Sequence, residues 1–125
     1  MIRYRRALIA VLAALLASAP LMVAAAELYP VRGLRFIVPQ SPGAQNDIQA
    51  RVIGQKLAEV FGQPVVMDNR PGAGGALGFE IAAQAPNDGY TLVLGSISTL
   101  SVIPVMPTKP RYDALKEFAP VTLIS

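Results

Sequence analysis

The sequence predicts an α/β fold built around a parallel sheet, and two observations carry this prediction. Short aliphatic and β-branched runs alternate with longer helical stretches in the order β-α-β-α-β, the spacing of strands joined by helical crossovers. The strand candidates are apolar along nearly their whole length, as strands covered on both faces are. Such a sheet is expected to bind its ligand beyond the carboxyl ends of its strands.

The first unit is a strand followed by a helix. Residues 34–38 (LRFIV) have strand composition and end in the turn-forming segment PQSPGAQN. Asn46 or Asp47 is expected to cap the helix that follows, and Gly62 is expected to end it. The apolar face of this helix is predicted from residues that recur at helical steps, namely Ile48, Val52, Ile53, Leu57, Val60 and Phe61.

The same unit then repeats along the chain. A second strand is predicted at residues 65–68, a second helix at 76–85 and a third strand at 91–94. The remaining segments are predicted, in order, as the start of a short helix at 96–101, a proline-rich surface connection at 105–113, one helical turn at 114–118 and a further strand at 121–124.

Composition excludes several classes of function. The 125 residues contain no histidine and no cysteine, which excludes a Ser-His-Asp triad, a thiolate nucleophile, a disulfide framework and a cysteine-ligated metal site in this chain. With 53% hydrophobic and 15% charged residues, the chain is too apolar for a disordered protein. No carboxylate pair suited to acid–base chemistry stands out, so an enzyme ranks below the two non-enzymatic functions considered below. No catalytic residue, metal site or cofactor is predicted.

Residues 1–26 are predicted to be a secretory signal peptide. Three arginines near the N-terminus precede the apolar run ALIAVLAALLA, and a tail of small residues ends at Ala26, after which cleavage is expected. A membrane anchor is the alternative, but the run is short against the roughly 20 residues of a membrane span. A lipoprotein anchor is excluded because the chain has no cysteine. We therefore expect a protein that is exported from the cytoplasm.

Charge argues against a nucleic-acid partner. The chain has 11 basic and 8 acidic residues, and removing the signal peptide removes three arginines and no acid. Residues 27–125 then carry 8 basic and 8 acidic side chains and no net charge. The apparent basicity belongs to the targeting segment, so no DNA- or RNA-binding surface is predicted.

Three loops leave the carboxyl ends of the predicted strands, at residues 39–47, 69–75 and 95–101. In the first, Gly43 precedes a helix whose N-terminal amides favour an anion, and Asp47 either caps that helix or receives a ligand amine or hydroxyl. The second is rich in glycine, which lets a backbone approach a ligand closely. There, Arg70 is expected to pair with Asp68 or another carboxylate. The third offers the hydroxyls of Ser96, Ser98, Thr99 and Ser101.

The glycines of the second loop also suggest a dinucleotide site, which we reject. The pattern GAGGALG follows a strand, but three residues separate it from that strand, where a dinucleotide fingerprint places its first glycine almost at once. The next strand ends in Gly-Ser instead of the acid that would hold a ribose. Export also argues against a soluble nicotinamide cofactor.

Several unusual strings, in order, resemble the solute-binding proteins of the tripartite tricarboxylate transporter system, the TctC or Bug family. They are Tyr29-Pro30, the loop at 39–47, GQPVVMDNRPGAGG at 62–75, APNDGYTL at 85–92 and YDALKEFAPVTLIS at 112–125. The resemblance covers essentially all of residues 29–125. It differs in the first loop, where Ala44 and Gln45 replace glycines that are usual in relatives, and at Ile103-Pro104, where relatives usually carry Asn-Pro.

The resemblance implies a periplasmic-binding-protein type II-like lobe and a non-enzymatic function. Such proteins close two lobes around a small organic carboxylate (a di- or tricarboxylate, an amino acid or an aromatic acid) and pass it to membrane permease subunits. The three loops named above would form the clamp through backbone amides and hydroxyls. The predicted ligand-binding residues are Gly43, Ala44, Asn46, Asp47, Ala73, Gly74, Gly75, Ser96, Ser98 and Thr99.

Residues 27–125 are expected to form a truncated N-terminal lobe whose partner lobe lies in later sequence, because family members are much longer and the chain stops just after a predicted strand begins. The alternative function is an exported α/β domain with a structural or interaction role and no ligand.

Overall fold

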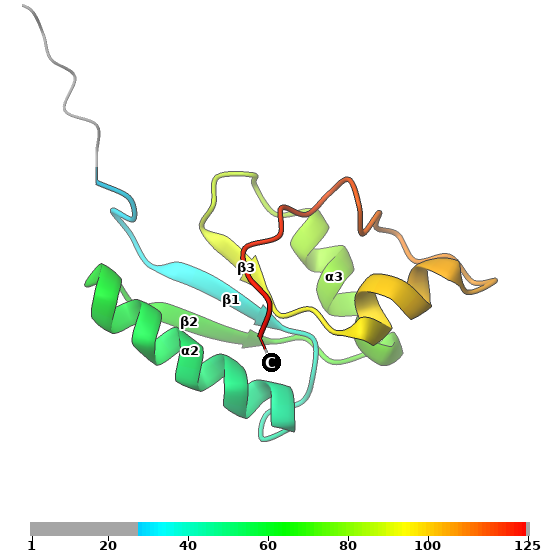
Figure 1. Cartoon of the computed structure of the whole chain (residues 1–125), viewed down its shortest axis with the longest axis horizontal. Helices are drawn as coiled ribbons and strands as arrows, with labels where there is room; N and C mark the ends of the chain where they lie inside the picture. The colour runs from blue at the N-terminus through cyan, green and yellow to red at the C-terminus, as the bar shows by residue number, and fades with distance from the viewer. Residues whose placement is uncertain (1–27, 125) are drawn as a thin grey trace, which may run out of the picture.

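A computed structural model describes residues 28–124, and the predicted signal peptide and its cleavage site lie outside this part of the chain. Three parallel strands form one sheet: β1 (Leu34–Val38), β2 (Val65–Asn69) and β3 (Thr91–Val93). They lie in the order β2-β1-β3, with Leu34 opposite Val65 and Arg35 opposite Thr91. The predicted α/β fold with a parallel sheet is confirmed, and all three arrows point the same way in Figure 1.

Helix α2 (Gln45–Phe61) covers one face of the sheet and packs on Phe36, Val38 and Leu94. Its buried residues are Asp47, Ala50 and Gly54, and a Cβ at position 54 would lie 2.2 Å from the Met67 Cε atom. The helix therefore approaches β2 along a line of small residues.

The predicted apolar face of this helix is wrong in part. The side chains of Ile48 and Val52 are 58% and 59% exposed, and Val60 is exposed as well. Close approach at Ala50 and Gly54 sets the rotation of the helix about its axis, which turns these larger residues outward. The predicted end is confirmed, because Gly62 adopts a left-handed conformation and its N–H donates to the Ala58 carbonyl.

Helix α3 (Ala76–Ala83) covers the opposite face, after a 3-10 turn at Ala73–Gly75. Phe79 is fully buried in a cluster with Ala76, Ile103 and Tyr112. The Phe79 ring lies 5.2 Å from that of Tyr112 and 5.0 Å from that of Phe118. This second core binds the C-terminal third of the described chain to the sheet.

Beyond β3 the chain forms a π-helical turn (Ser98–Val102) and a 3-10 turn (Ile103–Val105), and then an irregular connection, as predicted. A single helical turn begins at Asp113, whose side chain accepts the Leu115 N–H. The strand predicted at 121–124 is wrong. Val121 and Leu123 are exposed, and the segment runs at a steep angle to the strands instead of pairing with one (Figure 1).

Aromatic contacts close the other end of the sheet, where the strands begin. Tyr29 packs edge-to-face on Tyr90 and Phe61, and its hydroxyl donates to the Gly89 carbonyl. The Arg32 guanidinium lies 4.0 Å from the centre of the Tyr90 ring. The Tyr-Pro and Asp-Gly-Tyr strings of the sequence are therefore in contact.

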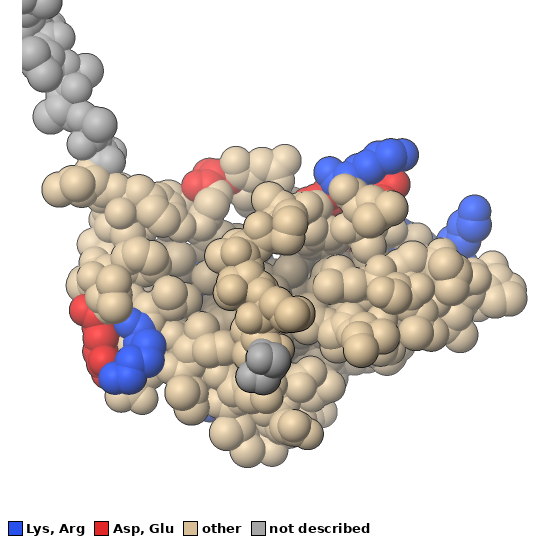
Figure 2. Space-filling model, viewed as in Figure 1, with Lys and Arg blue, Asp and Glu red and all other residues tan. Residues whose placement is uncertain are grey.

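Among residues 28–124, no helix is both long enough and apolar enough to cross a membrane. The face of the molecule in Figure 2 carries its charged side chains near the margins and is otherwise uncharged.

Candidate functional site

A hollow of about 370 Å³ lies beyond the carboxyl ends of β1 and β2. Two loops form its walls, and three of the predicted ligand-binding residues, Ala44, Gly74 and Gly75, lie in them. The complete lining is Pro39, Gln40, Ser41, Ala44, Pro71, Gly72, Gly74 and Gly75. The structure thus brings the first and second predicted loops together, 30 residues apart in the chain.

The two α-helices within residues 28–124, α2 and α3, both begin at this hollow. Ala44 is the N-cap residue of α2 and Gly75 is that of α3, and neither helix has a side-chain cap. The first N–H groups of a helix have no acceptor within the helix and carry a partial positive charge. No charged side chain lines the hollow. Its polarity therefore comes from backbone amides and from Gln40 and Ser41, an arrangement suited to an anion.

The glycine-rich loop turns its backbone toward this space through an unusual conformation. Four consecutive residues, 72–75, have positive φ, from 48° at Ala73 to 141° at Gly72. Gly75 has φ 104°, and a Cβ there would lie 2.7 Å from the Thr99 methyl carbon. Only glycine fits this position, because both the backbone angle and the space exclude a side chain.

Sequence reasoning missed Gln40 and Ser41, the two residues that bring polar side chains to the hollow. The loop at 39–47 was predicted, but within it only Gly43 and residues at the start of the helix were named as ligand-binding. Their place directly after a buried strand was the available signal, since the first residues beyond a parallel strand face the ligand side of the sheet.

Asp47 lies beside the hollow and is 2% exposed. Its carboxylate accepts the Gly43 N–H at 2.8 Å, the Asn69 side-chain amide at 2.8 Å and the Arg51 guanidinium at 2.9 Å. The predicted N-cap at Asn46 or Asp47 is wrong, because the helix begins earlier and Asp47 sits in its first turn. From there the carboxylate reaches back to an amide before the helix. Hydrogen bonds from Arg51, then from Gly43 and Asn69, hold the pKa of Asp47 well below its usual range.

Acid should therefore weaken the fold through Asp47. A carboxyl whose pKa is lower in the folded than in the unfolded state stabilises the fold above the unfolded pKa, and this contribution disappears as the pH falls toward the folded pKa. Above about pH 5, we expect Asp47→Asn to lower the urea midpoint of unfolding by a constant amount. Below about pH 4, the difference in urea midpoint between the variant and the parent chain should become smaller. A gap that stays constant from pH 7 to pH 2.5 would contradict this assignment.

The third predicted loop lies behind the glycine-rich loop and not in the hollow. Thr99 is buried, and its hydroxyl accepts the Ser96 N–H at 3.0 Å and donates to the Ser96 carbonyl at 3.1 Å. The Tyr112 hydroxyl donates to the Thr99 carbonyl. Ser96 is half-buried and Ser98 is exposed. This loop supports Gly75 from behind, and none of its three predicted residues lines the hollow.

The other predicted residues lie at the margin. Gly43 is exposed and its N–H is bonded to Asp47. Asn46 is half-buried in the first turn of α2, and Ala73 is exposed at the tip of the glycine-rich loop. None of the three lines the hollow.

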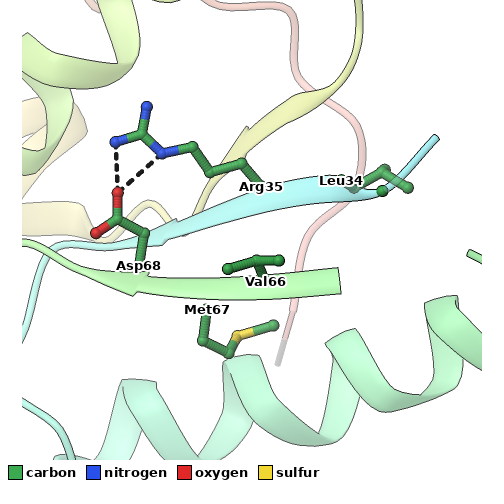
Figure 3. A pocket seen from close by; sticks show the side chains of 6 residues that line it. Leu34, Arg35, Val66, Met67 and Asp68 are labelled. Atoms are coloured by element: carbon green, nitrogen blue, oxygen red, sulfur yellow. Dashed lines mark hydrogen bonds and ion pairs between the residues drawn. The ribbon is translucent and has the colours of Figure 1, made fainter. Parts of the chain in front are cut away.

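A second hollow, of about 390 Å³, lies along the start of β1 and the middle of β2 and is drawn in Figure 3. Its charged groups satisfy each other: Arg35 donates to one oxygen of Asp68, and Arg70 donates to the other at 2.7 Å. Burial disfavours the charged carboxylate, but the two guanidinium groups outweigh it and lower the pKa of Asp68. The predicted pairing of Arg70 with Asp68 is confirmed. This hollow lies along the strands and not beyond their carboxyl ends, where a parallel sheet binds its ligand.

The fold and the site define an α/β lobe with an uncharged, amide-rich hollow at the carboxyl ends of its strands. Residues 49–125 match the family model described as tripartite tricarboxylate transporter family receptor, TctC. The chain belongs to this family, which confirms the resemblance drawn from the sequence. The family consists of solute receptors and not of enzymes.

One curated relative and two solved structures illustrate the similarity. Protein BugT of Bordetella pertussis (strain Tohama I) is 44% identical over 101 residues, which cover 79% of this chain and 31% of BugT. MatC from Rhodopseudomonas palustris, solved with bound malate, superposes with a TM-score of 0.70 at 36% identity, over 74% of this chain and 32% of MatC. The periplasmic binding protein BugD gives a TM-score of 0.68 at 32% identity, over 72% of this chain and 30% of BugD.

The superpositions on MatC and BugD confirm the predicted periplasmic-binding-protein lobe. They also show that the chain spans about a third of the length of the relatives that it matches.

Proposed function

We propose that this chain forms the N-terminal lobe of a periplasmic solute-binding component of a tripartite tricarboxylate-type transporter, and that it holds one end of a small organic carboxylate in the 370 Å³ hollow. The observation that carries the proposal is the convergence of two helix N-termini, at Ala44 and Gly75, on one space lined by uncharged residues. The malate bound in the related MatC supports the ligand class.

In this proposal, uncharged hydrogen-bond donors in the two loops and helix N-termini recognise the carboxylate. Backbone amides of the first turns of α2 and α3 would donate to the carboxylate, and the Gln40 and Ser41 side chains add donors on one wall. Because no side chain in the lining carries a charge, the site need not displace a paired cation to admit an anion. Export by the predicted signal peptide and delivery to membrane permease subunits belong to the same proposal.

A thermal-shift titration of the chain with malate, citrate, aspartate and benzoate tests the ligand class. Malamide is the matched control, since it keeps the size of malate and lacks its charges. We expect at least one carboxylate to raise the unfolding midpoint, by the equivalent of about 2.7 kcal/mol at 100 times its dissociation constant, and malamide to leave it unchanged. Equal effects of the acids and of malamide, or no effect of any, would favour an exported structural domain instead.

Ala44→Asp tests the site itself. Ala44 has the extended backbone of an N-cap residue, so an aspartate there is expected to stabilise α2 by about 1 kcal/mol while placing a negative charge in the hollow. We expect carboxylate affinity to fall at least about tenfold although the fold becomes more stable. Ala44→Asn is the control: it caps equally well without the charge and should retain more affinity. If both variants bind a carboxylate as the parent does, the hollow is not the site.

A further inference from the structure

The two walls of the hollow are joined by hydrogen bonds through side chains that do not line it. Asn69 is the last residue of β2 and leads directly into the glycine-rich loop. Its side-chain amide donates to the Gln40 carbonyl at 3.0 Å and to the Asp47 carboxylate at 2.8 Å. Asn69 therefore connects the second loop to both ends of the first.

Asp47 completes this connection from the helix side. One of its oxygens accepts the Asn69 amide, and the other accepts the Gly43 N–H and the Arg51 guanidinium. Arg51 also donates to the side-chain oxygen Oδ1 of Asn69 at 3.3 Å. Both carboxylate oxygens are thus engaged by protein donors, and the side chain is buried.

We propose that Asp47 and Asn69 are positioning residues, which set the separation of the walls at residues 40–44 and 71–75 without contacting the carboxylate. This inference rests on the proposed function, and it gives Asp47 a positioning role in place of the ligand contact predicted from the sequence. The Asp47 carboxylate is 2% exposed, and its oxygens already accept three of the about four donors that a carboxylate can take, so it offers little to a ligand amine or hydroxyl. Its negative charge is compensated by Arg51, 2.9 Å away.

The two possible roles of Asp47, as a charge near the ligand or as a residue that positions the walls, predict opposite changes in anion affinity when its charge is removed. If Asp47 acted on the ligand only through its charge, removing that charge would leave Arg51 unpaired near the hollow and would tighten the binding of an anion. If Asp47 holds the walls, its removal lets them drift and weakens binding. Asn69→Ala separates the two effects because it removes the bridge between the walls and leaves every charge in place.

Amide hydrogen exchange of the whole chain measures the position of the walls without any ligand. In Asn69→Ala we expect exchange in peptides covering 39–47 and 70–75 to accelerate about tenfold, with little change in peptides from α3. The control is Arg35→Gln, which removes an ion pair across the same two strands on the opposite face and leaves the Arg70–Asp68 pair. Unchanged exchange in Asn69→Ala, or equal acceleration in the control, would overturn the proposal.

Swapping the two side chains tests whether the hydrogen bond between positions 47 and 69 can be restored. In the double variant Asp47→Asn with Asn69→Asp, amide and carboxylate trade places, and Arg51 lies between both positions. The swap restores the bond between positions 47 and 69 but not the bond to the Gln40 carbonyl, so we expect it to recover part of the slow hydrogen exchange that Asp47→Asn alone loses. No recovery would show that only burial at these positions matters. Fast hydrogen exchange throughout the chain would mean that Asn69→Ala does not fold. In that case the milder variant Asn69→Ser tests the proposal through the same two peptides.

Malate titrations of the same variants distinguish this inference from the proposed function. With the walls released, malate affinity should fall about tenfold in Asn69→Ala and also in Asp47→Asn, despite the gain in positive charge of the latter. Tighter malate binding by Asp47→Asn would overturn the positioning role. If the parent chain binds none of the tested carboxylates, the proposed function fails, while hydrogen exchange still decides whether the two residues hold the walls.

Discussion

Replacing Phe79 with alanine is expected to lower the free energy of unfolding by about 3–5 kcal/mol, the largest effect of any single change considered for this chain. The Phe79 side chain is 1% exposed and joins α3 to Tyr112 and Phe118, far along the chain. Its loss leaves a cavity and removes two aromatic contacts together. Domains of this size have a total stability of about 5–15 kcal/mol, so this one change should remove between about a fifth and all of it.

Urea unfolding followed by circular dichroism measures this loss. Leu115→Ala serves as the control, because Leu115 is 92% exposed and its truncation should change stability by less than about 0.5 kcal/mol. If Phe79→Ala loses under about 1 kcal/mol, the C-terminal third does not pack on α3 as described.

Gly75→Ala is expected to destabilise the fold by about 2–5 kcal/mol and to abolish carboxylate binding. Two costs add at this position. Alanine is strained at φ 104°, and its Cβ would lie 2.7 Å from the Thr99 methyl carbon and 3.3 Å from the Pro39 Cβ. The Thr99 side chain cannot turn away freely, because its hydroxyl makes two hydrogen bonds to Ser96. Relief of the clash must therefore move the glycine-rich loop, which is a wall of the hollow.

Gly62→Ala separates strain from crowding. Gly62 also has positive φ, 65°, but a Cβ there meets no atom within 4 Å, and it lies at the end of α2 away from the hollow. Its replacement should cost only about 1–2 kcal/mol and leave malate binding unchanged. Equal losses of stability at the two positions would mean that Thr99 does not confine Gly75.

The strands and the end of α2 could be predicted because their signals are local. Apolar runs such as LRFIV form strands wherever both faces are covered, and Gly62 ends a helix through its own backbone freedom. The failed strand at residues 121–124 has the same kind of composition. A strand also needs a free neighbouring edge lying parallel to it, and no local pattern reports that neighbour.

The rotation of α2 could not be predicted, because small residues decided it. Ile48 and Val52 have the apolar character that normally marks a buried face, yet Ala50 and Gly54 face the sheet. Contact there depends on how closely β2 and its Met67 side chain allow the helix to approach. That distance is a property of the packed pair and is absent from either segment alone.

For this protein, the sequence by itself determined the α/β order, the three loops beyond the strand ends and the family. Each of these follows from residues that are neighbours in the chain. Only the tertiary structure decided what the loop residues do: Ala44, Gly74 and Gly75 line one hollow from two walls, Thr99 supports Gly75, and Asp47 bonds to Asn69. The physical reason is that burial and hydrogen-bond partners are set by segments 20 to 60 residues apart, whose meeting depends on the order of strands in the sheet.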